Sequence, residues 1–172
     1  MDPFIRYHVS HFYHFCDRRN LPLIRELRGL LSLEQLEARN IEIPAPGGND
    51  WSHDADRNKG LHRYVHLCLR NNHPMEFVAR QEGRIVDTVF LQVSSEVLQL
   101  DGVMYASGVS NRADVPIRTI DEARGLIDFE VAYTRTDWTD PAIKRRLDNC
   151  EKCEILVPDF IPIELIRNIA DG

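Results

Sequence analysis

One acidic residue stands out because it lies inside an apolar run. Glu154 belongs to the segment Cys-Glu-Ile-Leu-Val at residues 153–157, whose composition is typical of a buried β-strand. Strand alternation places Glu154 on the face of Leu156 and opposite Ile155. A carboxylate in a core strand needs a partner or a chemical task, because burying an unpaired charge is costly. The alternative is an edge-strand glutamate that faces water.

Two further polar features are candidates for ligand binding. The segment Tyr-His-Val-Ser-His occupies residues 7–11, and strand alternation would put His8 and Ser10 on one face, where both can hydrogen-bond a ligand. Arg57 lies in a polar segment, from which a guanidinium could hold a pyrophosphate or a reacting base. Each of these residues has an ordinary alternative as a solvated side chain.

The histidines and cysteines do not form a recognisable metal site. Cys150 and Cys153 make one C-x-x-C without a second, and His62 and His66 are four residues apart without the glutamate of a zincin. This spacing disfavours a zinc-dependent hydrolase, and we expect no metal and four reduced thiols. The glycine patterns of Rossmann and P-loop nucleotide sites and of the G-x-S-x-G elbow are also missing. Any nucleotide site must therefore be built from side chains and irregular loops.

Length and charge limit the remaining possibilities. The 172 residues predict one domain over residues 1–172, and no apolar run is long enough for a membrane span. We see no signal peptide and expect a cytoplasmic protein. The net charge of −6 argues against a broad basic surface for nucleic acid, but it allows a small basic cleft.

The elements that must position these residues follow from periodicity and capping signals. Helices are expected after Asn20, from Ser32 to Ala38, over one turn after Ser94, over residues 120–127, from Pro141 and from Pro162. Strands are expected at residues 4–9, 63–69, 75–80, 84–93, 103–107 and 153–157, with 84–93 central in the sheet and a loop over 42–60. Helices and strands interleave without a βαβ rhythm, which favours an α+β fold with a mixed central sheet.

The order of several short motifs resembles the DarT family, toxin ADP-ribosyltransferases that modify bases in single-stranded DNA. The motifs are residues 7–11, 20–24, Arg57, 60–65, 74–75 and 154–157, and with the flanking chain they span residues 7 to about 166. Two departures concern the ligand side. Ser10 stands where the family usually has Thr, and His-Leu-Cys-Leu-Arg follows Tyr64-Val65 in place of a more aromatic stretch.

The resemblance implies an ADP-ribosyltransferase fold, in which two β-sheets pack as a split sandwich with flanking helices and NAD lies in the central cleft. It implies that Glu154 and Arg57 are catalytic, and the segment of about residues 135–150 would shape the nucleic-acid side. The implied cofactor-binding residues are His8, Ser10, Asn20, Leu21 and Arg57, and the implied substrate-binding residues are Tyr64, Lys144, Arg145 and Arg146.

The chemistry of such a site can be argued from the residues. Breaking the nicotinamide–ribose bond passes through an oxocarbenium-like state, and a buried carboxylate that hydrogen-bonds a ribose hydroxyl stabilises the developing positive charge. One carboxylate suffices, because nicotinamide leaves without protonation. Arg57 would orient the pyrophosphate or the base, since a neutral guanidine is costly. A base can reach such a cleft only from a single strand or after flipping.

These considerations predict that the side chains of His8, Arg57 and Glu154 line one cavity. The substrate would be single-stranded DNA, with RNA as an alternative, and the resemblance implies a macrodomain antitoxin as partner. Other functions stay open from the sequence: an ADP-ribosyltransferase that acts on RNA or protein, and a non-catalytic NAD-binding or interaction domain.

Overall fold

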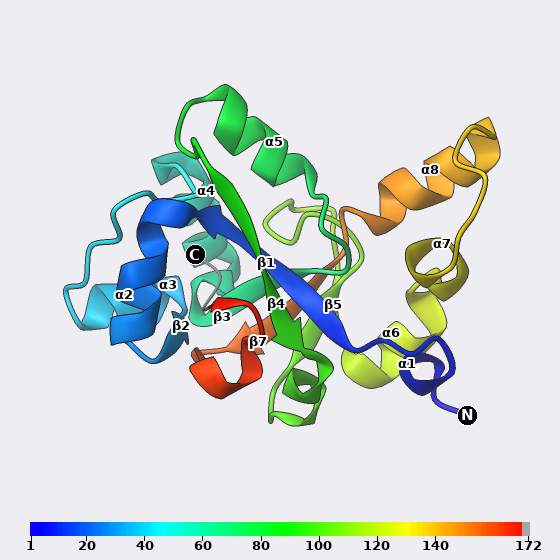
Figure 1. Ribbon diagram of the computed structural model, residues 1–172, viewed down its shortest axis with the longest axis horizontal. Helices are drawn as coiled ribbons and strands as arrows, with labels where there is room; N and C mark the ends of the chain where they lie inside the picture. Colours follow the sequence, from blue (N-terminus) through cyan, green and yellow to red (C-terminus); the bar gives the residue numbers. More distant parts are fainter. Residues whose placement is uncertain (170–172) are drawn as a thin grey trace.

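The computed structural model describes residues 1–169, and within them two antiparallel sheets are flanked by helices (Figure 1). The larger sheet has six strands in the order β4-β1-β3-β7-β5-β6, and the smaller pairs β2 with β8. The strands are β1 (His11–Asp17), β2 (Gly29–Leu31), β3 (Tyr64–Cys68), β4 (Thr88–Ser94), β5 (Met104–Ala106), β6 (Ile117–Thr119), β7 (Glu154–Pro158) and β8 (Phe160–Pro162). The α+β expectation is confirmed, but the strand pairings are antiparallel where we expected a mixed sheet.

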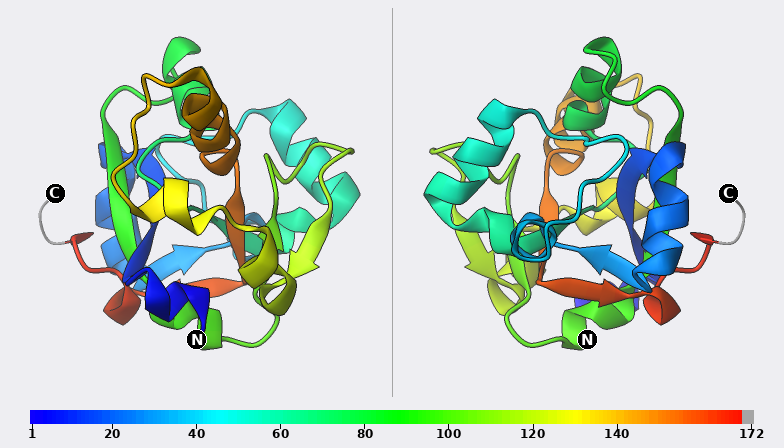
Figure 2. Two further views of the ribbon diagram at one scale, coloured as in Figure 1. Left: turned by 90° about the vertical axis from the view of Figure 1, so that its right-hand side faces the viewer. Right: turned by 90° about the vertical axis from the view of Figure 1, so that its left-hand side faces the viewer.

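Helices cover the two ends of the larger sheet. Helices α2 to α4 lie at one end and α1 with α6 to α8 at the other, as Figures 1 and 2 show. No helix within residues 1–169 is long and apolar enough to cross a bilayer. The α-helices are α1 (Pro3–Arg6), α2 (Leu21–Glu26), α3 (Leu33–Ala38), α4 (Asp50–Lys59), α5 (Pro74–Gln81), α6 (Ile120–Leu126), α7 (Phe129–Tyr133) and α8 (Pro141–Cys150). The 3₁₀ turns are η1 (Arg18–Asn20), η2 (Leu61–Arg63), η3 (Ser95–Gln99) and η4 (Ile163–Leu165).

The larger sheet opens between β1 and β3. Strands β3 and β7 pair over their whole length, whereas β1 and β3 share only the pair Tyr13–Cys68 and diverge beyond it. Next to this pair, the side chain of His14 in β1 donates from Nδ1 to the backbone carbonyl of His66 at 3.1 Å. This divergence makes room for a cavity on the sheet.

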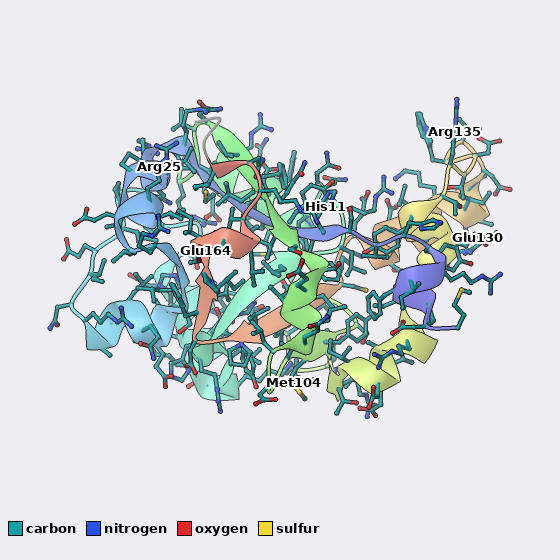
Figure 3. All side chains as sticks on the ribbon, turned by 60° about the horizontal axis from the view of Figure 1, so that its bottom comes forward. His11, Arg25, Met104, Glu130, Arg135 and Glu164 are labelled. Carbon is teal, nitrogen blue, oxygen red and sulfur yellow. The ribbon has the colours of Figure 1, made fainter. Side chains whose placement is uncertain are left out.

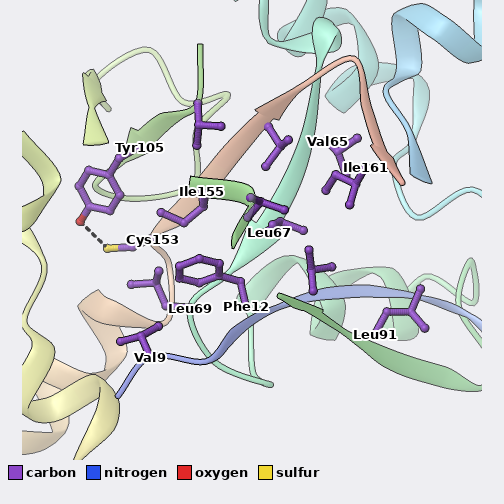
Figure 4. Packing of buried hydrophobic residues seen from close by; sticks show 14 of the residues in the cluster. Val9, Phe12, Val65, Leu67, Leu69, Leu91, Tyr105, Cys153, Ile155 and Ile161 are labelled. Atoms are coloured by element: carbon purple, nitrogen blue, oxygen red, sulfur yellow. Dashed lines mark hydrogen bonds between the residues drawn. The ribbon is translucent and has the colours of Figure 1, made fainter. Parts of the chain in front are cut away.

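A single core holds the central strands in place. The core joins β1, β3, β4 and β7 through side chains that have no exposed surface: Phe12, Leu67, Leu91 and Ile155 (Figure 4). Burying each such side chain contributes about 1.5–3 kcal/mol. Beside them, the Tyr105 hydroxyl donates to Cys153 Sγ at 3.2 Å, and the four cysteines are free and buried, as expected.

Local capping signals located several helices correctly. Ser32 Oγ accepts from Gln35 N at the start of α3, Thr119 and Glu122 form a reciprocal capping box for α6, and Asp140 caps α8. These side chains satisfy backbone N–H groups that the first helical turn leaves unpaired. The strands expected at 63–69, 103–107 and 153–157 and the turn after Ser94 are also confirmed.

Two segments expected to be strands are helices. Residues 4–9 include the end of α1, because Asp2 caps Phe4 N at 2.9 Å and Pro3 follows at the first helical position. Residues 75–80 lie in α5, because His73 Nδ1 accepts from Met75 N at 3.2 Å ahead of a proline start. In both segments the cap and proline outweigh β-branched and aromatic composition.

Three other expectations about the elements are wrong. Residues 42–60 contain α4, which Asn49 caps and which ends at Gly60, a residue with φ of +72°. Strand β4 begins at Thr88 rather than at residue 84 and lies at the edge of the sheet, not in its centre. The helix expected after Pro162 is only the 3₁₀ turn η4.

Candidate active site

A cavity of about 330 Å³ lies where β1 and β3 diverge. Its floor comes from β1, β3 and the first residue of β7, and its walls come from α2, α3, α4 and the loop that follows β5. The polar residues of its lining are His14, Asn20, Ser32, Glu37, Ser52, His53, Asp56, His62, Tyr64, His66, Ser110, Asn111 and Glu154. The cavity therefore combines an apolar helical wall with a polar floor.

Glu154 lies in the floor of this cavity. It pairs with Cys68 of β3 on one side and Ala106 of β5 on the other, so it is in the interior of the sheet and not on an edge strand. Only 6% of Glu154 is exposed. Its Oε2 accepts from the backbone N–H of Ser110 at 3.1 Å and lies 3.4 Å from His66 Nδ1. Its Oε1 lies 3.3 Å from His73 Nε2.

The surroundings of Glu154 keep its carboxylate charged. Burial alone would raise the pKa of Glu154, but hydrogen bonding from His66 and His73 outweighs burial and holds this pKa well below its usual range. Burial alone would lower the pKa of His66, but its contact with Glu154 and the charge of Asp56 raise this pKa to about 9. At neutral pH the site therefore contains a carboxylate–imidazolium pair, and the carboxylate can stabilise a developing positive charge.

Ser110 contacts both Glu154 and His66, and Lys59 holds the loop that carries Ser110. Ser110 is buried in the loop between β5 and β6, and its Oγ lies 3.1 Å from His66 Nδ1. Lys59, the last residue of α4, donates from Nζ to the backbone carbonyls of Ser110, Arg112 and Val115 at 2.5, 2.7 and 2.6 Å. No local sequence pattern indicates this contact, because Lys59 and Ser110 are 51 residues apart.

His73 is a site residue that the sequence analysis missed. Its Nδ1 accepts from Met75 N, so its Nε2 carries the proton that faces Glu154. The ring of Phe15 stacks on the imidazole with centroids 5.8 Å apart, and His73 is 1% exposed. The signal was available, because His73 directly precedes the Pro-Met pair at residues 74–75.

Asn20 fixes the chain that covers the cavity. Its amide donates to Ala45 O at 2.7 Å and accepts from Ala45 N at 2.8 Å, so it holds the segment before α4 and does not cap α2 with its side chain. On α4, Asp56 lines the same cavity, and its buried Oδ1 has no hydrogen-bond partner among the described residues. Burial raises the pKa of Asp56.

The structure brings together some of the residues expected at the site. Glu154, Asn20 and Tyr64 all line the main cavity. Leu21 does not, because its side chain is 1% exposed and belongs to the hydrophobic core. Arg57 lies just outside the lining, where its half-exposed guanidinium pairs with Asp54 at 2.9 Å and with Glu37, a residue of the cavity wall.

His8 and Ser10 lie elsewhere, in a second cavity of about 240 Å³. The expectation that His8, Arg57 and Glu154 line one cavity is therefore wrong. Residues 4–9 do not form the strand on which it depended, and β1 begins only at His11. The imidazole that lines the main cavity from β1 is that of His14. The sequence contains the Tyr-His pair twice, at residues 7–8 and at residues 13–14.

The basic side chains of α8 lie outside the main cavity. Lys144 pairs with Asp148 at 2.9 Å, and Arg146 pairs with Asp128 at 2.6 Å and Glu130 at 2.7 Å, while Arg145 is exposed. Figure 3 shows Glu130 and Arg135 at this end of the molecule, far from Arg25. Over residues 1–169, no cluster of three or more His, Cys, Asp or Glu side chains is arranged to hold a metal ion.

Comparisons with known proteins identify the family and the fold. Residues 13–170 match the family described as DarT, an ssDNA thymidine ADP-ribosyltransferase, and a search of curated proteins found no match. Among solved structures, a Thermus sp. 2.9 DarT in complex with ADP-ribosylated ssDNA is 17% identical with a TM-score of 0.67, and covers 91% of this chain and 78% of that chain. The same protein in complex with NAD⁺ gives 20% identity, a TM-score of 0.60, and 92% and 79% coverage.

A further similar structure is Thermosipho africanus DarTG in complex with ADP-ribose. It is 18% identical with a TM-score of 0.67, and the match covers 94% of this chain but 46% of that one. At these identities the structural likeness establishes the fold. The family match begins at residue 13, which excludes His8 and Ser10 and includes His14.

Proposed function

This chain belongs to the DarT family of single-stranded-DNA thymidine ADP-ribosyltransferases, and from this premise we propose how its site performs the transfer. ADP-ribose passes from NAD to a thymine base, and nicotinamide is released. The observation that carries the proposal is the ionised carboxylate of Glu154 in the floor of a cavity. The similarity to a DarT in complex with NAD⁺ supports NAD as the co-substrate.

Glu154 stabilises the sugar as its bond to nicotinamide breaks. The carboxylate accepts a hydrogen bond from a ribose hydroxyl, and its charge offsets the positive charge that develops on the oxocarbenium-like sugar. Ser110 N–H, His66 and His73 each approach one of the carboxylate oxygens, so they fix its orientation. A preorganised carboxylate of this kind needs no rearrangement at the moment of reaction.

The acceptor is the thymine ring nitrogen that carries a hydrogen. This nitrogen attacks C1′ of the ribose, the C1′–nicotinamide bond breaks, and the nitrogen loses its proton. Asp56 supports this step as the proton acceptor, because it lines the cavity with an oxygen that lacks a hydrogen-bond partner in the described part of the chain. A raised pKa makes a carboxylate a better base.

The remaining side chains bind and orient the two substrates. We assign the cofactor-contacting imidazole to His14 in place of His8, and Asn20 shapes the cofactor side through the segment at Ala45. Arg57 orients pyrophosphate or base from the rim, and exchanges its present partner Glu37 for the ligand. Tyr64 stacks on a ring in the cavity, and Arg145, which is exposed on α8, contacts DNA phosphates.

Incubation with labelled NAD tests this function. The wild-type protein should label a thymidine-containing single-stranded oligonucleotide and not the same oligonucleotide without thymidine, and Glu154→Gln should lose the label. Glu96→Gln is a matched control, because Glu96 is exposed in η3 and lies outside both cavities. Label on RNA or protein in place of DNA would contradict the proposed acceptor.

We also propose that the protein acts in the cytoplasm as a toxin whose modification a macrodomain antitoxin removes. Four buried free cysteines suit a reducing compartment. The similarity to a structure described as DarTG in complex with ADP-ribose supports a partner of this kind. Expression should arrest growth in a Glu154-dependent manner, and co-expression of an ADP-ribose-removing macrodomain should restore growth. Equal arrest by Glu154→Gln would contradict the toxin role.

A further inference from the structure

The main cavity has a floor and a wall of different chemistry. The floor contains the carboxylate of Glu154, whereas the wall consists largely of leucines from α2, β2 and α3. The leucines that line it are Leu23, Leu27, Leu30, Leu31, Leu33 and Leu36. The volume of about 330 Å³ lies within the ~300–1,000 Å³ range of small-molecule sites. A dinucleotide whose reacting ribose lies at Glu154 therefore extends its adenosine towards the leucine wall, which suits the flat face of a purine.

Glu37 adds a negative charge to this wall. It lies in the last turn of α3, directly after Leu36, and its half-exposed side chain lines the cavity. The Arg57 guanidinium contacts Glu37 through Nη2 and Asp54 through Nη1, the latter at 2.9 Å. Two carboxylates thus share one guanidinium, so the three side chains together carry a net negative charge.

The rest of the lining does not offset this charge. Among the described residues that line the main cavity, none is a lysine or an arginine. The carboxylates of the lining are Glu37, Asp56 and Glu154, and the buried Oδ1 of Asp56 has no hydrogen-bond partner within residues 1–169. Because like charges repel strongly where water is scarce, this lining disfavours a ligand that carries an additional phosphate.

NAD and NADP differ by one such phosphate, at the 2′ position of the adenosine ribose. In dinucleotide sites of the Rossmann fold, a carboxylate that accepts from the 2′-hydroxyl favours NAD, and a nearby arginine accommodates the 2′-phosphate of NADP. Glu37 supplies a carboxylate on the adenosine side of this cavity. When Arg57 turns to the pyrophosphate, Glu37 gives up its cationic partner, and its oxygens become available to the ribose.

From this arrangement we propose that Glu37 makes the site selective for NAD over NADP. The inference rests on the proposed function and adds to it the residue that recognises the adenosine ribose. Glu37 accepts a hydrogen bond from the 2′-hydroxyl of NAD. It repels the 2′-phosphate of NADP, which as a phosphate monoester carries about −1.5 to −2 charges at pH 7. Glu37 thus acts on the choice of dinucleotide and not on the breaking of the nicotinamide–ribose bond.

The test compares ADP-ribose with ADP-ribose 2′-phosphate, which correspond to NAD and NADP but lack nicotinamide and cannot react. In isothermal titration calorimetry, the wild-type Kd should be about 10²-fold higher for the 2′-phosphate, because juxtaposed like charges cost several kcal/mol. In Glu37→Gln, this ratio of Kd values should fall at least about tenfold, since the amide still bonds the 2′-hydroxyl but no longer repels the phosphate. The ratio of kcat/KM for transfer from NAD and from NADP should fall in parallel.

Two control variants separate this role from other effects of charge. Glu42→Gln removes an exposed carboxylate next to Ile41 and Ile43, which line the cavity although Glu42 does not, so the wild-type ratio of Kd values should persist. Asp54→Asn removes the other partner of Arg57 and leaves Glu37 in place, so it should also keep that ratio. A fall in Asp54→Asn as large as in Glu37→Gln would assign the selectivity to a freed Arg57 and overturn the role of Glu37.

The remaining outcomes distinguish this inference from the proposed function. Equal wild-type affinity for the two ligands would overturn the selectivity and leave the proposed function standing. An unchanged ratio in Glu37→Gln would overturn the role of Glu37. A protein that binds ADP-ribose but transfers nothing to thymidine would overturn the proposed function, whereas the two Kd values would still test Glu37. Binding of neither ligand would overturn both.

Discussion

Replacing Glu154 by glutamine should remove both the chemistry and a pH-dependent part of the stability. Glutamine keeps the shape of the side chain and its oxygen can still accept from Ser110 N–H, but the negative charge is lost. His66 then loses the partner that raises its pKa, and burial, which lowers this pKa, has the larger effect. The substitution thus separates the electrostatic role of Glu154 from its packing.

The magnitude follows from the pKa of His66. A rise from 6.5 to about 9 corresponds to about 3 kcal/mol of extra stability for the folded state that carries the imidazolium. Because the folded pKa lies above the unfolded value, this stabilisation is complete below pH 6.5 and is lost as the pH rises through about 9. In Glu154→Gln, the same pH range should produce little loss from His66.

Urea denaturation at pH 6 and pH 10 measures this difference. The wild-type free energy of unfolding should fall by up to about 3 kcal/mol more than that of Glu154→Gln between the two pH values. Groups that titrate equally in both proteins cancel in the comparison. Transfer by the variant should drop at least 10²-fold, the order found when one preorganised transition-state contact is removed. Identical pH profiles in the two proteins would refute the ion pair, and full transfer activity would refute the catalytic role.

Three other substitutions test how the site is held in place. Lys59→Met should lower the free energy of unfolding by about 2–4 kcal/mol in urea denaturation, because three backbone carbonyls lose a charged donor. It should also lower kcat, because the loop that carries Ser110 is released, and an unchanged kcat would exclude this positioning role. Asn20→Ala should cost about 2–3 kcal/mol and raise KM for NAD, because both backbone groups of buried Ala45 lose their partner; wild-type KM would contradict its role at the cavity. Hydrogen bonding from Arg19 holds the pKa of Asp17 well below its usual range, so the wild-type should lose more stability than Asp17→Asn as the pH falls below about 4; parallel acid denaturation curves would be the contrary result.

Residues whose signals are local were predictable from the sequence. The caps at Ser32, Thr119 and Asp140 satisfy N–H groups within three residues of themselves, so a short pattern contains the whole interaction. Glu154 was predictable for a similar reason, because a carboxylate within an apolar strand conflicts with its neighbours. His73 shows the limit of this approach. Its local role is to cap α5, but its role in the site is its contact with the carboxylate of Glu154, which no local pattern indicates.

The choice between two similar motifs could not be made from spacing alone. Tyr-His occurs at residues 7–8 and again at 13–14, and from the sequence we expected a strand at the first pair and none at the second. The helix cap at Asp2 decides against the first, and the divergence of β1 from β3 turns the second toward the cavity. The first pair lines the second cavity, so His8 lies outside the cavity that contains Glu154.

The sequence by itself determined the family, the α+β class and the carboxylate at residue 154, because ordered motifs and a charge in an apolar strand can be read along the chain. Only the tertiary structure decided which side chains meet that carboxylate. Ser110, His66 and His73 reach Glu154 from three separate elements, and Lys59 holds the loop of Ser110 from a fourth. Their contacts join residues 44 to 88 positions apart, and their geometry depends on strand register and on the opening of the sheet, which periodicity does not encode.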